Sequence, residues 1–181
     1  MNDAAILHAP GPDGIEAFAA AIGRHAGILR KVAATYCSTA EDRADLIQDI
    51  LVQLLAARES YDPQRPLSTW MYRLALNVAI SQVRSRYRQA RLIVPIEDDH
   101  LEVAGPGADH EGRQERALLD RAMQGLDPLA SAIMLLYLDG YSQAQIAEIV
   151  GISASNAGTK IARIKQKLRD SIGTNQSQET L

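Results

Sequence analysis

The stretch that most constrains the fold is "LIVPIEDDHLEVAGPGADHEG", which shows no sustained hydrophobic period and contains two prolines and three glycines. Loops of this length are uncommon inside a compact domain, so residues 93–111 predict a linker between domains. A chain of 181 residues is long enough for two small domains. The predicted organisation is a disordered lead at 1–14, a first domain at 15–92, the linker at 93–111, a second domain at 112–172 and a disordered tail at 173–181.

The first domain shows a helical period. Apolar residues fall at positions 15, 18, 22, 29, 33 and 36, and a second apolar stripe runs over residues 46–55. Between these stripes, Ser38 and Glu41 have the spacing of a capping box. The prolines of "YDPQRP" end the second stripe. A third helical run is then predicted from Ser68, as its N-cap, to about Arg91.

The second domain has clearer helix boundaries. The segment "RQERALLDRAMQGL" predicts a short amphipathic helix, and Asp127 with Pro128 predicts the N-cap and first position of the next one. Ser142 and Gln145 have capping-box spacing, and Gly151 ends the helix that they open. The last predicted helix carries Ala157, Ile161, Ile164 and Leu168 on one face. The only strand candidate is the marginal "RLIVPI", so the predicted fold class is all-α, with two small helical domains joined by a linker.

Composition excludes several classes of protein. Cys37 is the only cysteine, which excludes a disulfide framework and a cysteine-built zinc site. The four histidines are scattered without metal-ligand spacing such as HExxH, so we expect no metal, no cofactor and no enzyme activity. No run of about 18 apolar residues exists, which excludes membrane insertion through a helix. The N-terminus has no basic segment typical of a signal peptide, so we expect a cytoplasmic protein.

Charge is distributed unevenly along the chain. The net charge is −3, which by itself argues against nucleic-acid binding. Residues 84–91, however, hold four arginines and no acid, and residues 160–170 hold five basic residues against one acid. Residues 97–115 hold seven acids against one arginine. Two basic stretches are thus separated by an acidic one, and this distribution matters more for nucleic-acid binding than the net charge does.

The segment "YSQAQIAEIVGISASNAGTKIARIKQKLRD" has the form of a helix-turn-helix. Ala147 is small where two helices would pack closely, Gly151 suits the turn, and Ile146, Val150 and Ile152 would bury the motif. Opposite the apolar stripe of its second helix lie Ser155, Asn156, Thr159, Lys160, Arg163 and Lys167. Amide and guanidinium groups read base edges, and lysines bind phosphates. Taken alone, an ordinary helical hairpin with a solvated basic face remains an alternative.

Three motifs in one order carry a family resemblance. "ADLIQDIL", "LSTWMYRLALNVAISQVRSRYR" and the helix-turn-helix together resemble a bacterial RNA polymerase sigma factor of the extracytoplasmic-function type, over about residues 15–170. The resemblance implies sigma region 2 in the first domain and region 4 in the second. It implies promoter DNA as ligand and core RNA polymerase as partner, contacted at the β′ clamp helices and the β flap. It also admits an anti-sigma factor as a further partner.

The same resemblance implies roles for individual residues. "DLIQD" resembles the segment that docks on the clamp helices, with Asp45, Gln48 and Asp49 at its polar positions; a solvated helix face is the alternative. "STWMYRLALN" resembles the segment that melts the downstream (−10) promoter element. The implied contacts with that element are Tyr72, Arg73, Asn77, Arg84, Arg86 and Arg88, and those with the upstream (−35) element are the six residues of the helix-turn-helix. We expect Trp70 to be a core aromatic rather than a base-stacking one.

The sequence departs from the family pattern in its details. Ser81 stands where the family often has an acid, and "SNAGTK" replaces the usual start of the recognition helix. Gly158 in that helix costs about 1 kcal/mol relative to Ala and would allow close approach to the DNA backbone. Two alternatives remain open. A sigma-like module that only titrates an anti-sigma protein would not need the basic stretches, and a plain helix-turn-helix regulator would leave "DLIQD" and "STWMYRLALN" unexplained.

Overall fold

The computed structural model describes residues 12–90, 123 and 125–178, and every regular element within these ranges is a helix. The chain divides into two compact units, Met1–Asp98 and Asp99–Leu181, which we call unit 1 and unit 2. The predicted linker at 93–111 and almost all of the predicted helix at 113–126 lie outside the described residues. The all-α prediction is confirmed for the part of the chain that the structure describes.

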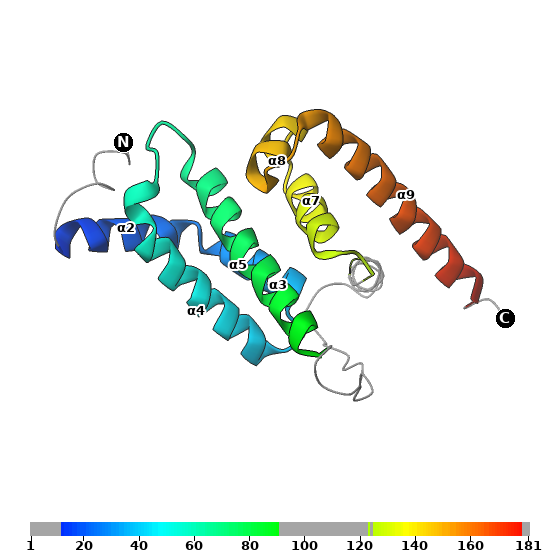
Figure 1. The fold of residues 1–181 in the computed structure, drawn as a ribbon, viewed down its shortest axis with the longest axis horizontal. Helices are drawn as coiled ribbons and strands as arrows, with labels where there is room; N and C mark the ends of the chain where they lie inside the picture. The colour runs from blue at the N-terminus through cyan, green and yellow to red at the C-terminus, as the bar shows by residue number, and fades with distance from the viewer. Residues whose placement is uncertain (1–11, 91–122, 124, 179–181) are drawn as a thin grey trace. The chain divides into compact units, whose positions relative to one another are not determined.

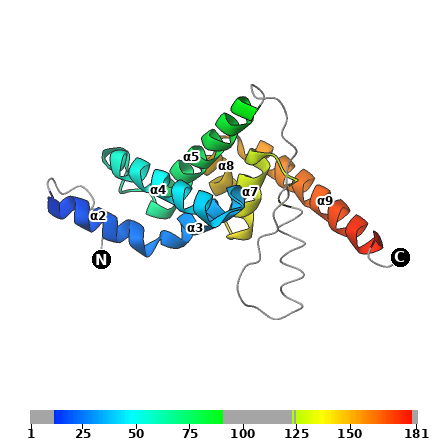
Figure 2. The ribbon, with the colours of Figure 1, turned by 90° about the horizontal axis from the view of Figure 1, so that it is seen from below.

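Unit 1 is a bundle in which α3 (Ala26–Tyr36), α4 (Ala40–Ala56) and α5 (Leu67–Ala90) all pack against one another. The short 3-10 helix η1 (Arg58–Ser60) follows α4, and α2 (Pro12–Arg24) packs on α3 and α4 (Figures 1 and 2). The fully buried side chains of the core include Phe18, Val32, Leu46, Ile50, Leu54 and Met71. Burying each such side chain contributes about 1.5–3 kcal/mol, so this core holds the faces of α4 and α5 in place.

The first apolar stripe of unit 1 is divided between two helices. The backbone N–H of His25 bonds to the carbonyl of Ile22, only three residues back, at 2.9 Å, and this tight turn separates α2 from α3. Ile22 and Leu29 are buried on either side of the turn, so the stripe continues across the break. The helix also starts at Pro12, inside the predicted disordered lead.

Two predicted N-caps in unit 1 were wrong, by one residue for α4 and by two for α5. The N-cap of α4 is Thr39, whose hydroxyl accepts the backbone N–H of Asp42 at 3.0 Å, and not Ser38. Ser38–Glu41 and Thr39–Asp42 have the same spacing, so the sequence alone gives two possible registers. The helix α5 begins at Leu67, which places Ser68 within its first turn and not at its N-cap.

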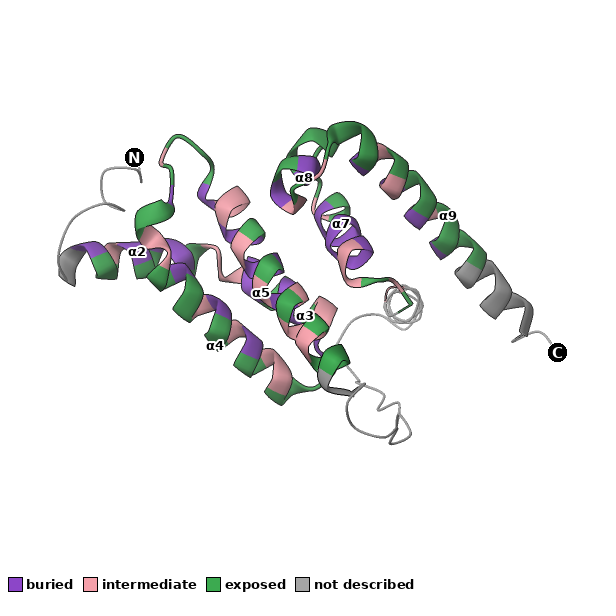
Figure 3. Ribbon diagram, in the orientation of Figure 1, coloured by how far each residue is buried: buried purple, intermediate pink, exposed green. Residues whose placement is uncertain are grey.

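Unit 2 consists of α7 (Pro128–Leu138), α8 (Gln143–Val150) and α9 (Ala154–Gln178), each packed on the other two. Residues 130–136 of α7 are all buried, and Figure 3 shows this helix largely purple. The apolar stripe Ala157, Ile161, Ile164 and Leu168 of α9 is buried as predicted. The helix continues to Gln178, so the predicted disordered tail begins too early.

The predicted caps of unit 2 are confirmed. The Asp127 carboxylate accepts the backbone N–H groups of Leu129 and Ala130, both at 3.0 Å, with Pro128 at the first helical position. Ser142 and Gln145 form the reciprocal capping box at the start of α8. Each such cap is worth about 1 kcal/mol. Gly151 ends α8 at φ 74°, a left-handed conformation that favours glycine and turns the chain into α9.

Candidate nucleic-acid and protein interfaces

The outer face of α4 carries the predicted docking residues. Asp45, Gln48 and Asp49 are all exposed, while Leu46, Ile50 and Leu54 anchor the opposite face in the core. Two side chains that the sequence reading did not select extend the same face toward the end of the helix: Val52 is 55% exposed and Leu55 is 38% exposed. Large apolar side chains exposed together on one helix face favour a protein-binding surface.

The exposed face of α5 is a stripe of polar and basic residues. Arg73, Asn77, Ser81, Arg84 and Arg88 are exposed at successive spacings of three or four residues, and half-buried Ser85 lies among them. Residues at such spacings share one face of a helix. The predicted strand-contacting residues Arg73, Asn77, Arg84 and Arg88 therefore lie together. This face offers cations and an amide group along about four helical turns.

Tyr72 does not belong to this stripe. Its side chain is only 1% exposed, because it lies on the core face with Ala75, Leu76 and Ala79. A nucleic-acid strand has no access to a side chain buried this far, so we correct its predicted role from DNA contact to core residue. Trp70 is half-buried, with ring centroids 5.9 Å from Phe18 and 5.5 Å from Tyr61, which agrees with its predicted place in the core.

Arg86 also lies away from the stripe. Its guanidinium is 3.0 Å from the Asp42 carboxylate of α4, so it joins two helices of unit 1. Arg84 and Arg88 are each two residues from Arg86, which places them on nearly the opposite side of α5. Arg86 therefore contributes to the contact between α4 and α5, and because its side chain is still 52% exposed, its role in phosphate binding stays a prediction. On the same side of α5, Gln82 donates a hydrogen bond to Asp49.

Cys37 lies at the end of α3, beside this contact. Its thiol is buried, and its carbonyl accepts a hydrogen bond from Arg43 Nε at 2.9 Å. Burial raises the pKa of the thiol, while the charges of Arg86 and Arg43 partly lower it and Asp42 raises it further. The sequence shows no basic residue close to Cys37, but the fold brings Arg86 near it from 49 positions along the chain (37 to 86).

In unit 2, the outer face of α9 carries the predicted recognition residues. Ser155, Asn156, Thr159, Arg163 and Lys167 are exposed and Lys160 is half-buried, all turned away from the buried stripe. The Ser153 hydroxyl accepts the backbone N–H of Asn156 at 3.2 Å and so caps the first turn. The motif is buried by Ile146, Ala147 and Ile149, whereas the predicted Val150 and Ile152 are only half-buried.

Two lysines of α9 have partners inside unit 2. Lys167 Nζ donates to the carbonyl of Gly125 at 2.8 Å, which ties α9 to the start of the described part of this unit. Lys165 Nζ lies 5.1 Å from the centre of the Tyr137 ring and 3.2 Å from its hydroxyl. These two lysines therefore interact with groups inside unit 2 as well as with solvent. The side chains of Lys160 and Arg163 on the outer face make no hydrogen bond or ion pair with another described residue.

Gly158 faces α8 and not an open surface. A Cβ at this position would lie 3.2 Å from Gln143 Oε1 and 3.3 Å from Gln143 Nε2. The glycine therefore leaves room for the end of the Gln143 side chain against α9. Our prediction that Gly158 allows close approach to DNA is not tested by this contact and stays a prediction.

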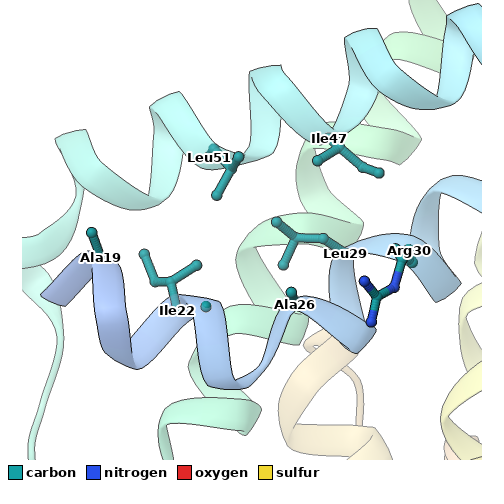
Figure 4. Close-up of a pocket in the computed structure, with 8 residues that line it drawn as sticks. Ala19, Ile22, Ala26, Leu29, Arg30, Ile47 and Leu51 are labelled. Atoms are coloured by element: carbon teal, nitrogen blue, oxygen red, sulfur yellow. The ribbon is translucent and has the colours of Figure 1, made fainter.

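One open groove lies in unit 1 between α2–α3 and α4 (Figure 4). Ile47 and Leu51 of α4 point toward Ile22 and Leu29, and Arg30 is the charged residue of its lining. A groove of this composition suits an apolar side chain of a protein partner better than a polar ligand. Within the described ranges, no cluster of His, Cys, Asp and Glu could hold a metal ion, and no helix could cross a membrane.

Comparison with known proteins places both units in one family. Residues 21–89 match the family model for sigma-70 region 2, and residues 116–168 match that for sigma-70 region 4. The RNA polymerase sigma factor CnrH of Cupriavidus metallidurans is 29% identical over 161 residues, covering 84% of each chain. The ECF RNA polymerase sigma factor SigM of Mycobacterium tuberculosis is 26% identical over 174 residues, covering 95% of this chain and 85% of the relative.

Two solved structures share the fold. The sigma factor RpoE from Bartonella quintana, in complex with the anti-sigma factor NepR, gives a TM-score of 0.71 at 22% identity, covering 86% of this chain and 96% of that one. CnrH in complex with the cytosolic domain of CnrY gives a TM-score of 0.67 at 23% identity, covering 96% and 99%. The likeness extends over both units.

Proposed function

The chain belongs to the sigma-70 family, whose members direct RNA polymerase to promoters, and we propose how its exposed faces divide that work. Unit 1 binds core polymerase through the outer face of α4 and holds the melted downstream element on α5. Unit 2 reads the upstream element with α9. The observation that carries the proposal is the pair of exposed polar and basic stripes on α5 and α9, each backed by a buried apolar stripe.

On α5 the geometry suits a single strand. Arg84 and Arg88 supply cations for phosphates, and Asn77 can donate to and accept from the edge of an unpaired base. Tyr87, near the end of the helix, is 67% exposed, and an exposed aromatic ring among arginines provides a stacking surface. We add Tyr87 to the proposed strand contacts; its signal in the sequence was an aromatic residue inside a run of arginines.

On α9 the geometry suits the major groove of a duplex. A single exposed helix face with Asn156, Lys160 and Arg163 near its N-terminal half can reach base edges and phosphates together. For the β flap of the polymerase we propose the end of α7, where Tyr137 is 38% exposed and Leu138 is 52% exposed. Exposed apolar side chains that are adjacent on a helix end favour a protein contact.

An anti-sigma factor is the second proposed class of partner. The RpoE and CnrH structures were both determined with partners, NepR and CnrY, the first of which is named as an anti-sigma factor. The observations argue against the alternative in which the chain only titrates such a protein. A titrating module would not need the exposed polar and basic stripes on α5 and α9. Transcription from a promoter separates the two functions.

Run-off transcription with purified core polymerase on genomic fragments tests the proposal. We expect discrete transcripts that require the chain and that disappear when Asn77 and Arg163 are both replaced by alanine. A chain that binds core polymerase but yields no transcript from any fragment would support the titrating alternative. A chain that binds DNA specifically without core polymerase would instead support a plain helix-turn-helix regulator.

Docking on the polymerase is tested separately. Asp49→Lys reverses a charge on the outer face of α4, and we expect it to weaken co-purification with core polymerase while the helical circular dichroism is unchanged. Glu16→Lys makes the same change at an exposed position of α2, away from the proposed face, and should leave co-purification at the parental level. Equal co-purification of all three chains would contradict the docking assignment.

A further inference from the structure

Two side-chain contacts join α4 to α5 along their shared edge. Gln82 Nε2 of α5 donates to Asp49 Oδ2 of α4, and Arg86 of α5 bonds to Asp42 of α4 at 3.0 Å. The two groups of α5 are one helical turn apart, and the two carboxylates are two turns apart. Both contacts hold the same two helices, but only one ends on a residue of the proposed polymerase-binding face.

Asp49 differs in this respect from the other docking residues. Within the described residues no hydrogen bond reaches the side chain of Asp45 or Gln48, whereas the carboxylate of Asp49 is held by an amide. An ionised carboxylate has two oxygens and about four acceptor sites. The bond from Gln82 engages Oδ2 and leaves Oδ1 available to a donor of another protein. The contact therefore orients Asp49 without consuming its capacity to bind.

We propose that Gln82 is a positioning residue for polymerase binding, which orients the Asp49 carboxylate and thereby links the polymerase-binding face of α4 to the DNA-strand helix α5. This inference rests on the proposed docking role of Asp49. A side chain that is already ordered loses less conformational freedom when its partner binds, so the orienting bond strengthens association. Because Gln82 is on the helix that carries Asn77, Arg84 and Arg88, docking through Asp49 also fixes the position of that helix relative to the polymerase.

The experiment compares variants of the full-length chain in titrations with purified core polymerase, followed by fluorescence anisotropy of an N-terminal label. Gln82→Leu removes the amide but keeps a side chain of similar size, and we expect it to weaken binding about two- to tenfold. Asp42→Asn is the matched control, because it weakens the other contact between α4 and α5. We expect Asp42→Asn to bind core polymerase like the parent, since Asp42 does not orient a docking residue.

A double-mutant cycle distinguishes positioning from simple packing. Asp49→Ala should weaken binding, and Gln82→Leu should then have no additional effect in the Asp49→Ala background, because the amide acts through the carboxylate. Thermal unfolding of each variant checks that unit 1 remains folded. If Gln82→Leu lowers the unfolding temperature strongly, Gln82→Met serves as a second variant without a donor.

The outcomes separate this inference from the proposed function. Equal binding by the Asp49→Ala variant and the parent would overturn the docking assignment, and the inference with it. Weakened binding by Asp49→Ala together with parental binding by Gln82→Leu would overturn the inference alone. Equal losses from Gln82→Leu and Asp42→Asn would also overturn it, because packing of α4 on α5 would then account for both.

Discussion

At the scale of single residues, the reactivity of the Cys37 thiol can be used to measure how well the core of unit 1 is packed. It is the only thiol of the chain, and burial raises its pKa above the ordinary value of 9.0. Because only the thiolate reacts, the folded protein should react with a disulfide reagent slowly at pH 8, and the reaction rate should rise through a midpoint above pH 9.0. In urea, the reaction should be fast and the midpoint should return to the ordinary value. Fast reaction of the native protein at pH 8 would show that Cys37 is accessible.

Two basic residues of α9 have separable roles. If Arg163 reads a base edge, Arg163→Ala should cost about 1–3 kcal/mol of binding free energy and relax preference at one promoter position. If Lys160 binds phosphate, Lys160→Ala should weaken binding to all promoters alike and lower the salt slope by about one unit. Binding curves at several salt concentrations measure both effects. Parental curves for both variants would leave α9 with a solvated basic face.

The same scale shows where sequence reasoning about sites succeeded and failed. Asn77 and Arg163 were predicted to be surface residues, and both are exposed in the structure. A polar residue opposite the apolar stripe of an amphipathic helix faces solvent when the stripe packs on the core. Tyr72 was assigned to the surface for its chemistry, although its spacing to Leu76 and Ala79 matches the core face. The bond between Arg86 and Asp42 could not be predicted from local sequence, because the two residues are 44 positions apart.

At the scale of helices, two glycines of unit 2 should respond oppositely to alanine. Gly158 lies inside α9, and the nearest atoms to an added Cβ belong to the end of the flexible Gln143 side chain, which can move. The higher helix propensity of alanine therefore outweighs this contact, and Gly158→Ala should raise the free energy of unfolding by about 0.5–1 kcal/mol. Gly151 has φ 74°, so Gly151→Ala should lower it by about 1–2 kcal/mol.

Urea unfolding followed by circular dichroism measures both changes, and promoter binding adds a second result for Gly158. Because Gly158 faces Gln143, Gly158→Ala should bind the upstream element like the parent. Weaker binding with unchanged or higher stability would show that the glycine serves close approach to DNA, as the sequence first suggested.

The helix boundaries show which caps can be predicted from local sequence and which cannot. The caps at Asp127 and Ser142 were predicted correctly, because each stands alone before an apolar run and its bonds are made within three residues. The cap of α4 was ambiguous, because Ser38 and Thr39 are adjacent and each has an acid three residues later. The structure resolves the ambiguity in favour of Thr39, whose hydroxyl accepts the backbone N–H of Asp42.

At the scale of the whole molecule, the two predicted domains correspond to two compact units that match two different parts of one family. Each unit has its own buried core, so we expect a surface change in one unit to leave the packing of the other unit's core unchanged. A variant of α5 should therefore impair promoter opening without impairing binding to the upstream element, and a variant of α9 should impair that binding. The residues that test this separation are Asn77 and Arg163, both exposed on the face opposite the core of their own unit.

Asn77→Ala should lower promoter opening while binding to the upstream element stays near the parental level. Holding an extruded base offsets an unstacking cost of a few kcal/mol, so loss of one amide contact should reduce the population of open complexes. Permanganate reactivity of unpaired thymines in the downstream element measures opening, on duplex and on pre-melted templates. The pre-melted template should rescue part of the defect of Asn77→Ala, because its bases are already unpaired, but none of the defect of Arg163→Ala, which concerns recognition of the duplex. If Asn77→Ala opens the duplex as well as the parent does, strand holding must move to Arg73 and Tyr87, the other exposed candidates near this stripe.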